Sequence, residues 1–171
     1  MANRNESVRF ENHSQMRLTS LADYAVVMMA AAARHDAGAR LSATVLAEET
    51  GIPLPTAQKL TGRLAAAGLL ETARGTGGGL TLTRTAAEIS LADIIEAVEG
   101  PIQMTSCVDA ERHDCALERA CQVRPHMGVV NGAVRGALAA VSLDTLADSA
   151  PAKAGAQTPG WTPAFAGEQV R

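Results

Sequence analysis

The sequence predicts a mostly α-helical fold with one small β-hairpin. Apolar residues make up 47% of the 171 residues but aromatic residues only 2%. A core of Ala, Leu, Val, Ile and Met suits packed helices better than a β-sandwich, because strands favour aromatic and β-branched residues. Several segments also carry apolar residues at the three- and four-residue steps of a helix, whereas one segment alternates as a strand does.

Two terminal segments are expected to be disordered. Residues 1–15 are polar and aperiodic, and residues 149–171 are rich in Pro, Gly and Ala, so neither can build a core. No apolar run approaches the roughly 20 residues that span a bilayer, and the N-terminus lacks the apolar centre of a signal peptide. We therefore expect a cytoplasmic protein without membrane contact, whose thiols stay reduced.

The first helix is expected to start at Thr19 or Ser20, either of which can cap it, and to end at Gly38. Two shorter helices follow, the first bounded by Ser42 and Gly51. The second has a proline in its first turn, where a missing N–H costs nothing, and ends at Gly68. Two short helices joined by a tight turn form a helix-turn-helix, with an ordinary helical hairpin as the alternative.

The next stretch, ETARGTGGGLTLTR, reads as strand, Gly-rich loop, strand, since Leu80 and Leu82 alternate with threonines. A hairpin directly after a helix-turn-helix is a wing. Its glycines, including Gly77 and Gly78, would let the backbone approach DNA, and Arg74 could reach a phosphate or a narrow minor groove. No GK[ST] follows these glycines, which argues against a nucleotide-binding loop.

Charge divides the chain into two units. Residues 16–84, the predicted winged helix-turn-helix DNA-binding domain, carry seven Lys or Arg and five Asp or Glu. Residues 85–148 carry four and ten respectively. A basic front and an acidic back fit a DNA-binding half joined to another unit.

The second unit is expected to hold a helix capped by Ser90, a cysteine-containing loop and a long helix from about Pro125 to Val141. The long helix carries an apolar seam that fits packing against a second helix, either in a homodimer, which we favour, or within the chain. The seam residues are Met127, Val130, Val134, Ala137 and Val141.

All three cysteines lie in the loop, in the spacing C-x7-C-x5-C at Cys107, Cys115 and Cys121. A closed zinc site usually uses CxxC pairs, and none is present. A redox switch would need only two of the thiols. An iron–sulfur cluster fits better, because its spread-out irons accept ligands from a longer loop, but it usually takes four protein ligands. His113, His126, a carboxylate or a group from elsewhere would complete the set.

These segments together resemble the bacterial winged-helix regulators that sense iron–sulfur clusters or nitric oxide, typified by IscR, NsrR and RirA. The opening MRLTSLADYAV, the wing ARGTGGG, the segment SLADIIEAVEGP and the three-cysteine loop match in order over most of residues 16–148. LADYAVVMM, IEAVEGPI and CALERACQVR are most similar to the subgroup that regulates the SUF iron–sulfur assembly operon.

The resemblance implies a homodimer with crossing long helices, a [2Fe–2S] or [4Fe–4S] cluster near the interface, and cluster-dependent binding to double-stranded operator DNA. In the nitric-oxide-sensing members an aspartate of the partner's first helix completes the cluster, and Asp23 occupies that place. In IscR members a histidine three residues after the last cysteine does so, but here that position is Arg124. The first cysteine gap, seven residues instead of the commoner five, departs from the best-known members.

Position in the helix-turn-helix motif assigns Thr56, Gln58, Lys59 and Arg63 to the DNA-facing helix, and Gln58 could pair bidentately with adenine. The sequence thus predicts a transcription regulator and not an enzyme, since no Ser/His/Asp set or carboxylate pair is legible. The alternatives are an iron–sulfur scaffold or redox protein, and a zinc- or thiol-based redox-sensing regulator.

Overall fold

The structure is a computed structural model that describes residues 18–36, 39, 41–73, 79–105, 108 and 121–148. The expected disordered segments, 1–15 and 149–171, lie outside the described residues. In chain order the elements are α1 (Ser20–Ala33), α2 (Ala43–Thr50), α3 (Leu54–Ala66), β1 (Leu70–Ala73), β2 (Gly79–Leu82), η1 (Ala86–Glu88), α4 (Leu91–Glu99), α5 (Arg124–Ala139) and α6 (Leu143–Ala147).

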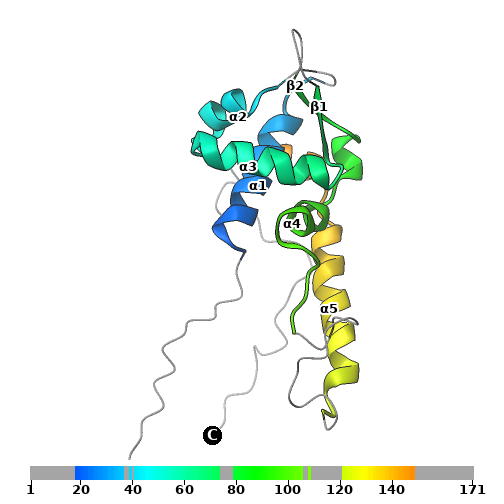
Figure 1. Cartoon of the computed structure of the whole chain (residues 1–171). Coiled ribbons are helices and arrows are strands. Elements are labelled where there is room, and N and C mark those ends of the chain that lie inside the picture. The colour runs from blue at the N-terminus through cyan, green and yellow to red at the C-terminus, as the bar shows by residue number, and fades with distance from the viewer. Residues whose placement is uncertain are drawn as a thin grey trace, which may run out of the picture.

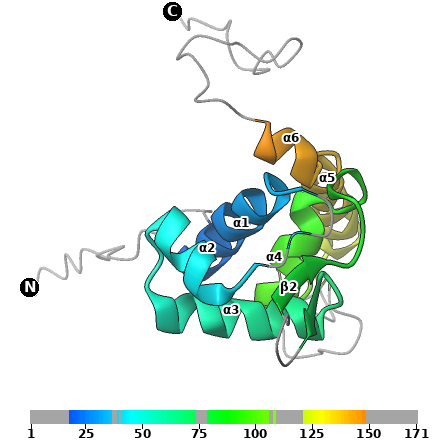
Figure 2. The same ribbon diagram turned by 90° about the horizontal axis from the view of Figure 1, so that it is seen from above.

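Helix α1 lies at the centre of the folded body, with α2, α3, α4 and α6 around it (Figure 2). Met28 and Met29 on this helix are fully buried, as expected for a core without aromatic residues. Thr19 caps its start, because its hydroxyl accepts a hydrogen bond from the Ala22 amide at 3.3 Å. The helix ends at Ala33, earlier than the expected Gly38. There the amides of Arg34 and His35 donate to carbonyls only three residues back, at 3.1 and 3.4 Å.

Helices α2 and α3 form the predicted helix-turn-helix. Ser42 caps α2, accepting from the Val45 amide at 3.1 Å, and Gly51 ends it in the left-handed conformation with φ 71°. Ala57, Leu60 and Leu64 form the fully buried face of α3. The spacing of these three residues is that of one helical face, which seats α3 firmly against α1 and α4.

Strands β1 and β2 form the predicted hairpin, an antiparallel pair with Leu70 opposite Leu82 and Ala73 opposite Gly79. Leu41, just before α2, joins the ladder through two backbone hydrogen bonds with Leu80, at 2.7 and 3.1 Å. The hairpin is thereby fastened to the helical body, and the fold is the expected mostly helical one with a small wing.

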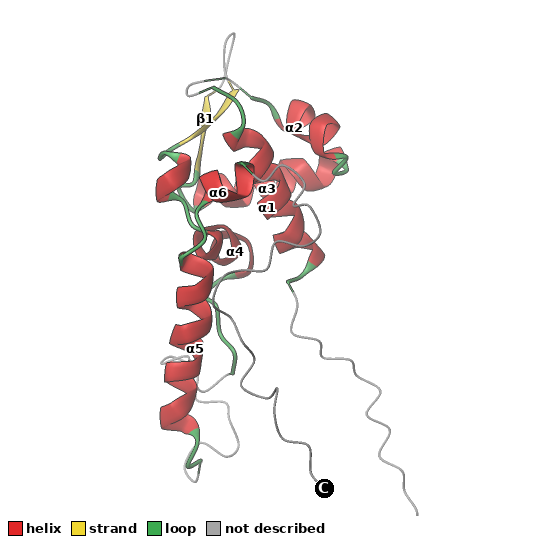
Figure 3. Ribbon diagram, turned by 180° about the vertical axis from the view of Figure 1, so that it is seen from behind, coloured by secondary structure: helices red, strands yellow, loops and turns green. Residues whose placement is uncertain are grey.

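Helix α4 begins at the expected Ser90 and buries Ile94, Ile95 and Val98. Helix α5 extends away from the helical body, on the side opposite to the hairpin (Figures 1 and 3). After α5 the chain returns to α4, where the Leu91 amide donates to Val141 and the Leu143 amide to Ile89, each at 2.8 Å. The short helix α6 was not expected from the sequence.

Candidate nucleic-acid interface and metal-binding segment

The outer face of α3 is the candidate DNA-reading surface. Gln58, Lys59 and Gly62 are exposed there, and Thr56 is half-buried near the start of the helix. A Cβ atom added at Gly62 would have no heavy atom within 4 Å, so this face is open at Gly62. An exposed helix second in a helix-turn-helix can enter a major groove of DNA.

The predicted DNA residue Arg63 also lies on α3, but at the flank that faces α4. Its guanidinium Nη1 donates a hydrogen bond to the backbone carbonyl of Val98, in the last turn of α4. Among the residues described, this contact ties the candidate reading helix directly to α4.

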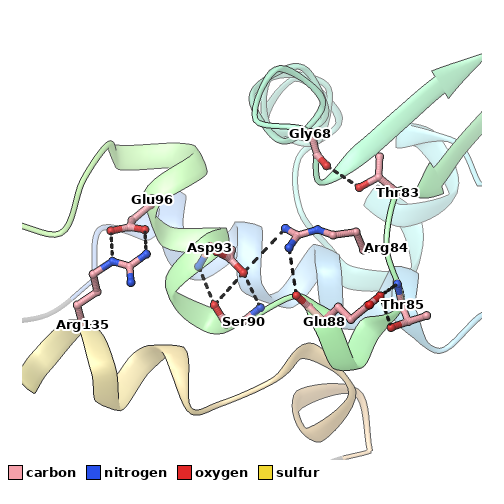
Figure 4. A network of polar contacts seen from close by, with 9 residues as sticks. All are labelled: Gly68, Thr83, Arg84, Thr85, Glu88, Ser90, Asp93, Glu96 and Arg135. Atoms are coloured by element: carbon pink, nitrogen blue, oxygen red, sulfur yellow. Dashed lines mark hydrogen bonds and ion pairs between the residues drawn. The ribbon is translucent and has the colours of Figure 1, made fainter. Parts of the chain in front are cut away.

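The hairpin is anchored to the same body by polar contacts (Figure 4). Arg84, just after β2, donates to the Glu88 carbonyl at 3.2 Å and lies 3.9 Å from the Asp93 carboxylate of α4. The Thr83 hydroxyl donates to the carbonyl of Gly68, at the end of α3. The base of the wing therefore keeps a defined position beside α3. The predicted wing residues Arg74, Gly77 and Gly78 lie outside the described residues.

Three carboxylates at and just before α4, those of Glu88, Asp93 and Glu96, have a lowered pKa. Hydrogen bonds from Thr85 lower the pKa of Glu88. Burial raises the pKa of Asp93, but the amide and hydroxyl of Ser90 outweigh it and the net pKa is lowered. The hydrogen bond from Arg135 lowers the pKa of Glu96. These carboxylates act as caps and ion-pair partners and not as proton donors.

The C-terminal turn of α4 joins several elements. Glu96 accepts two hydrogen bonds from Arg135 of α5, at 2.8 and 2.9 Å, and one from the Ile102 amide at 3.3 Å. The Thr19 hydroxyl at the start of α1 donates to the Glu99 carboxylate. With the Arg63–Val98 contact, this turn touches α1, α3, α5 and the segment after α4.

Of the three predicted cysteine ligands, only Cys121 is described. Its thiol is free and half-buried, three residues before α5 begins. Cys107 and Cys115 lie outside the described residues. Asp23 is exposed in the first turn of α1, and within the described ranges no three His, Cys, Asp or Glu residues come together as a metal site.

Within one chain, Asp23 and Cys121 lie toward opposite ends of α5. The start of α1 faces the later half of α5, since Leu18, Val134 and Leu138 line one groove of about 620 Å³. Ten helical steps separate Val134 from Arg124 at the start of α5, about 15 Å along the axis. Cys121 comes just before Arg124, at the end of α5 that is remote from the start of α1.

The face of α5 that points away from α4, called the outward face below, has a composition that was not predicted from the sequence. Met127, Asn131, Val134 and Leu138 are half-buried and face the chain's own α4 side, and no residue of α5 is fully buried. Val129, 74% exposed, lies on the opposite face. The same face carries Gly128, Gly132, Gly136 and Ala133. The four-residue glycine spacing was visible in the sequence.

Comparison with known proteins places this geometry in a family. Residues 18–149 match the Rrf2 family, described as iron-dependent transcriptional regulator. The chain belongs to the Rrf2 family. It is 32% identical over 134 residues to the HTH-type transcriptional regulator IscR of Photorhabdus laumondii, covering 78% of this chain and 80% of that protein. It is 34% identical over 110 residues to the repressor NsrR of Streptomyces coelicolor, covering 64% and 73%.

The fold agrees with that of solved Rrf2 regulators. The crystal structure of the oxidized form of Staphylococcus aureus CymR superposes with a TM-score of 0.58 at 27% identity, covering 78% of this chain and 98% of CymR. This Rrf2 protein is therefore a winged-helix, DNA-binding transcriptional regulator and not an enzyme. In the described part of the chain, no helix is both long and apolar enough to cross a bilayer.

Proposed function

We propose that this Rrf2 protein is a homodimeric regulator whose DNA binding depends on an iron–sulfur cluster. The cluster would be held by Cys107, Cys115 and Cys121, with Asp23 of the partner subunit as the fourth ligand. It would work in the cytoplasm on double-stranded operator DNA, at genes for iron–sulfur cluster assembly of the SUF type. The observation that carries the proposal is the half-buried Cys121 thiol just before α5, a helix whose outward face has open space at Gly128, Gly132 and Gly136.

The chemistry of the donor set fits a cluster. Three thiolates are the ligands that iron–sulfur clusters take, and a carboxylate as fourth ligand would be held less firmly than a thiolate. When bound, the cluster would supply iron that responds to oxidants, nitric oxide or iron supply. A labile cluster suits a sensor, and the description of the matched family as iron-dependent supports this choice.

The outward face of α5 supports a dimer. It presents Gly, Ala and Val with no Lys, Arg, Asp or Glu, whereas a solvated helix face normally carries charge. A Cβ atom built at Gly128, Gly132 or Gly136 would meet nothing within 4 Å, so another helix backbone can approach closely. None of the sixteen residues of α5 is fully buried within one chain, so burial against a second helix would stabilise it further.

The distance between Asp23 and Cys121 along α5 supports ligation across the dimer. If two α5 helices cross antiparallel near Gly132, the Cys121 end of one lies near the later half of the other. That later half faces the start of α1 and hence Asp23. With a ligand from the partner subunit, loss of the cluster would remove a contact between the two protomers and so shift the conformational equilibrium of both.

The DNA contacts proposed are Thr56, Gln58 and Lys59 on α3, with Arg74, Gly77 and Gly78 in the wing. Gln58 and Lys59 are exposed on the open face of α3, which supports this assignment. Lys59 would contact a phosphate and Gln58 a base edge.

Anaerobic purification, an absorption spectrum and an iron count test the cluster. We expect a coloured protein with iron and sulfide, which binds DNA upstream of iron–sulfur assembly genes more tightly than unrelated DNA. Affinity should fall with salt at a log–log slope of about −0.9 per phosphate contact. A colourless, zinc-loaded protein would reject the cluster, and a salt-independent response would reject the DNA contacts.

A thiol-based redox regulator is the second candidate. The likeness to CymR, solved in an oxidized form, favours it. Mass spectrometry after mild peroxide treatment distinguishes the two. A redox switch would show an oxidised Cys121 and altered DNA affinity in protein free of iron, whereas a cluster sensor would respond only when loaded.

A further inference from the structure

The contact between Arg63 and Val98 is where the reading helix meets the part of the chain that leads to the cysteines. Arg63 lies in the last turn of α3, and Val98 in the last turn of α4. The guanidinium donates to the Val98 carbonyl, which is one of the four carbonyls that end a helix without an intrahelical donor. A cation at a helix C-terminus also interacts favourably with the helix dipole.

The chain after α4 leaves this carbonyl open to Arg63. Gly100 has φ 87° and Pro101 has no N–H, so α4 cannot continue. The Ile102 amide, which would reach Val98 in a continued helix, instead donates to the Glu96 carboxylate at 3.3 Å. Arg63 therefore takes the place of a donor that the following segment has directed elsewhere.

The same turn of α4 is fixed from the other side by α5. Arg135 holds Glu96 through two hydrogen bonds at 2.8 and 2.9 Å. Asn131, one turn earlier on α5, accepts from the Met104 amide at 2.9 Å. Segment 101–105, which precedes Cys107, is thus held between the end of α4 and α5. A shift of this segment or of α5 would act on the side chain of Glu96, two residues before Val98 in the same turn of α4.

Arg63 is poorly placed as a phosphate contact on the centre of the α3 face. The fully buried residues Ala57, Leu60 and Leu64 define the inner side of α3, and Lys59 and Gly62 lie nearly opposite them. Arg63 lies at the edge between the two sides, toward α4. Its guanidinium is already engaged by a carbonyl.

We infer that Arg63 is a positioning residue that couples the orientation of α3 to the state of α4, segment 101–105 and α5, and that it does not hold a DNA phosphate. The inference rests on the proposed function, because the coupling matters only if α3 reads DNA and the cysteine segment senses the signal. It deepens that proposal by naming the contact through which the two halves communicate.

Arg63→Met tests the coupling, with Lys59→Met as its matched control on the same helix. Methionine keeps an unbranched stem and a high helix propensity, so α3 is retained. DNA affinity is measured against salt for cluster-loaded and cluster-free dimers. For Arg63→Met we expect the same salt slope as for the wild type. The cluster-loaded and cluster-free forms of this variant should bind DNA with affinities that differ by no more than about twofold, whereas allosteric effects are typically about 5–150-fold.

Lys59→Met should behave in the opposite way. It should reduce the slope by about 1.8 for two lost phosphate contacts per dimer and keep the affinity ratio. Arg63→Lys, which retains a charge and a donor, should recover most of the ratio. If Arg63→Met fails to fold, Arg63→Gln takes its place with the same criteria.

Hydrogen exchange without DNA or cluster provides an independent readout. If the Gly100 and Ile102 amides exchange faster in Arg63→Met, the contact between Arg63 and Val98 stabilises the end of α4. If Arg63→Met lowers the slope as Lys59→Met does and keeps the ratio, or changes neither slope, ratio nor exchange, the coupling role is wrong. If the wild-type protein binds no DNA in either state, the proposed function fails first, and the coupling role falls with it whatever the exchange rates.

Discussion

The carboxylate of Glu96 and the guanidinium of Arg135 form a bidentate ion pair that joins α4 to α5. Nε donates to Oε1 at 2.9 Å and Nη2 donates to Oε2 at 2.8 Å. Through this pair α5, which follows the segment with the three cysteines, is attached to α4, which contacts α3. Paired donors fix orientation as well as distance, which a lysine at position 135 could not do.

This ion pair should make stability depend on pH in the acid range. Arg135 lowers the pKa of Glu96 below its ordinary value of 4.5, so the pair stabilises the folded state above that pH and is lost as the pH falls through the lowered pKa. Both side chains are partly exposed, so we expect only about 0.5–1 kcal/mol. Urea unfolding of wild type and Glu96→Gln should differ by this amount at pH 7, and the difference should disappear as the pH falls below the lowered pKa of Glu96. An equal difference above and below that pKa would contradict the assignment.

Bulk on the outward face of α5 should dissociate the proposed dimer. Gly132→Leu adds a side chain where the isolated chain has open space and leucine is the better helix former, so the protomer should stay folded. Between close-packed helices the same side chain would force them apart. Sedimentation velocity should show at least about tenfold weaker dimerisation, about 1.4 kcal/mol.

The control adds bulk at an exposed site away from α5. Ala87→Leu in η1 provides it, because Ala87 is exposed. This variant should associate as wild type does. If Gly132→Leu associates as the wild type does, the dimer interface does not include this face of α5.

Mixed dimers can locate the fourth cluster ligand. Asp23→Ala should fold normally, because Asp23 is exposed and contributes only about 0.3–1 kcal/mol at the start of α1. Its homodimer should lose iron faster than wild type. A heterodimer of one Asp23→Ala chain and one Cys121→Ala chain should retain one site of normal lifetime, since the intact cysteines then face the partner's Asp23.

Ligation within one chain predicts a different result for the same heterodimer. Each chain would then carry one defect in its own site, and neither site would be normal. Iron release followed by absorbance separates the two arrangements, and a normal lifetime in the Asp23→Ala homodimer would exclude Asp23 altogether.

Gly62 should trade helix stability for access to DNA. It is exposed in the interior of α3, and a Cβ there has open space, so Gly62→Ala should raise the free energy of unfolding by about 0.5–1 kcal/mol. On the DNA-facing side, the added methyl should hinder close approach to the groove. We expect about fivefold weaker binding, about 1 kcal/mol, with an unchanged salt slope because no charge is removed. Unchanged affinity would show that this turn of α3 stays away from the DNA.

Local signals in the sequence were reliable because they act over a few residues. Ser42, Gly51 and Ser90 cap the predicted helices, and Leu80 is buried in the predicted strand. The first helix ends before Gly38, and α6 was missed. Helix α6 is only five residues long, too short for a periodic signal, and it is retained because Leu143 is fully buried.

The apolar seam expected on α5 was only partly on its exposed side. Met127 and Val134 are half-buried against their own chain, whereas Val130 is 45% exposed. Hydrophobic spacing identifies an apolar face but does not say which neighbour covers it, since a side chain of the same chain or of another satisfies it equally. The way α5 packs against α4 determines which of its faces points outward.

The helix-turn-helix, the wing and the family resemblance could be predicted from the amino-acid sequence, as could the grouping of all three cysteines within residues 107–121. Each of these depends on residue type and near-neighbour spacing. Three contacts became visible only in the folded chain: Arg63 with Val98, and Glu96 with Arg135 and with Ile102. The folded chain also showed that Asp23 and Cys121 lie toward opposite ends of α5. Such relationships join residues tens of positions apart, and they arise from how helices pack and not from any local preference of the chain.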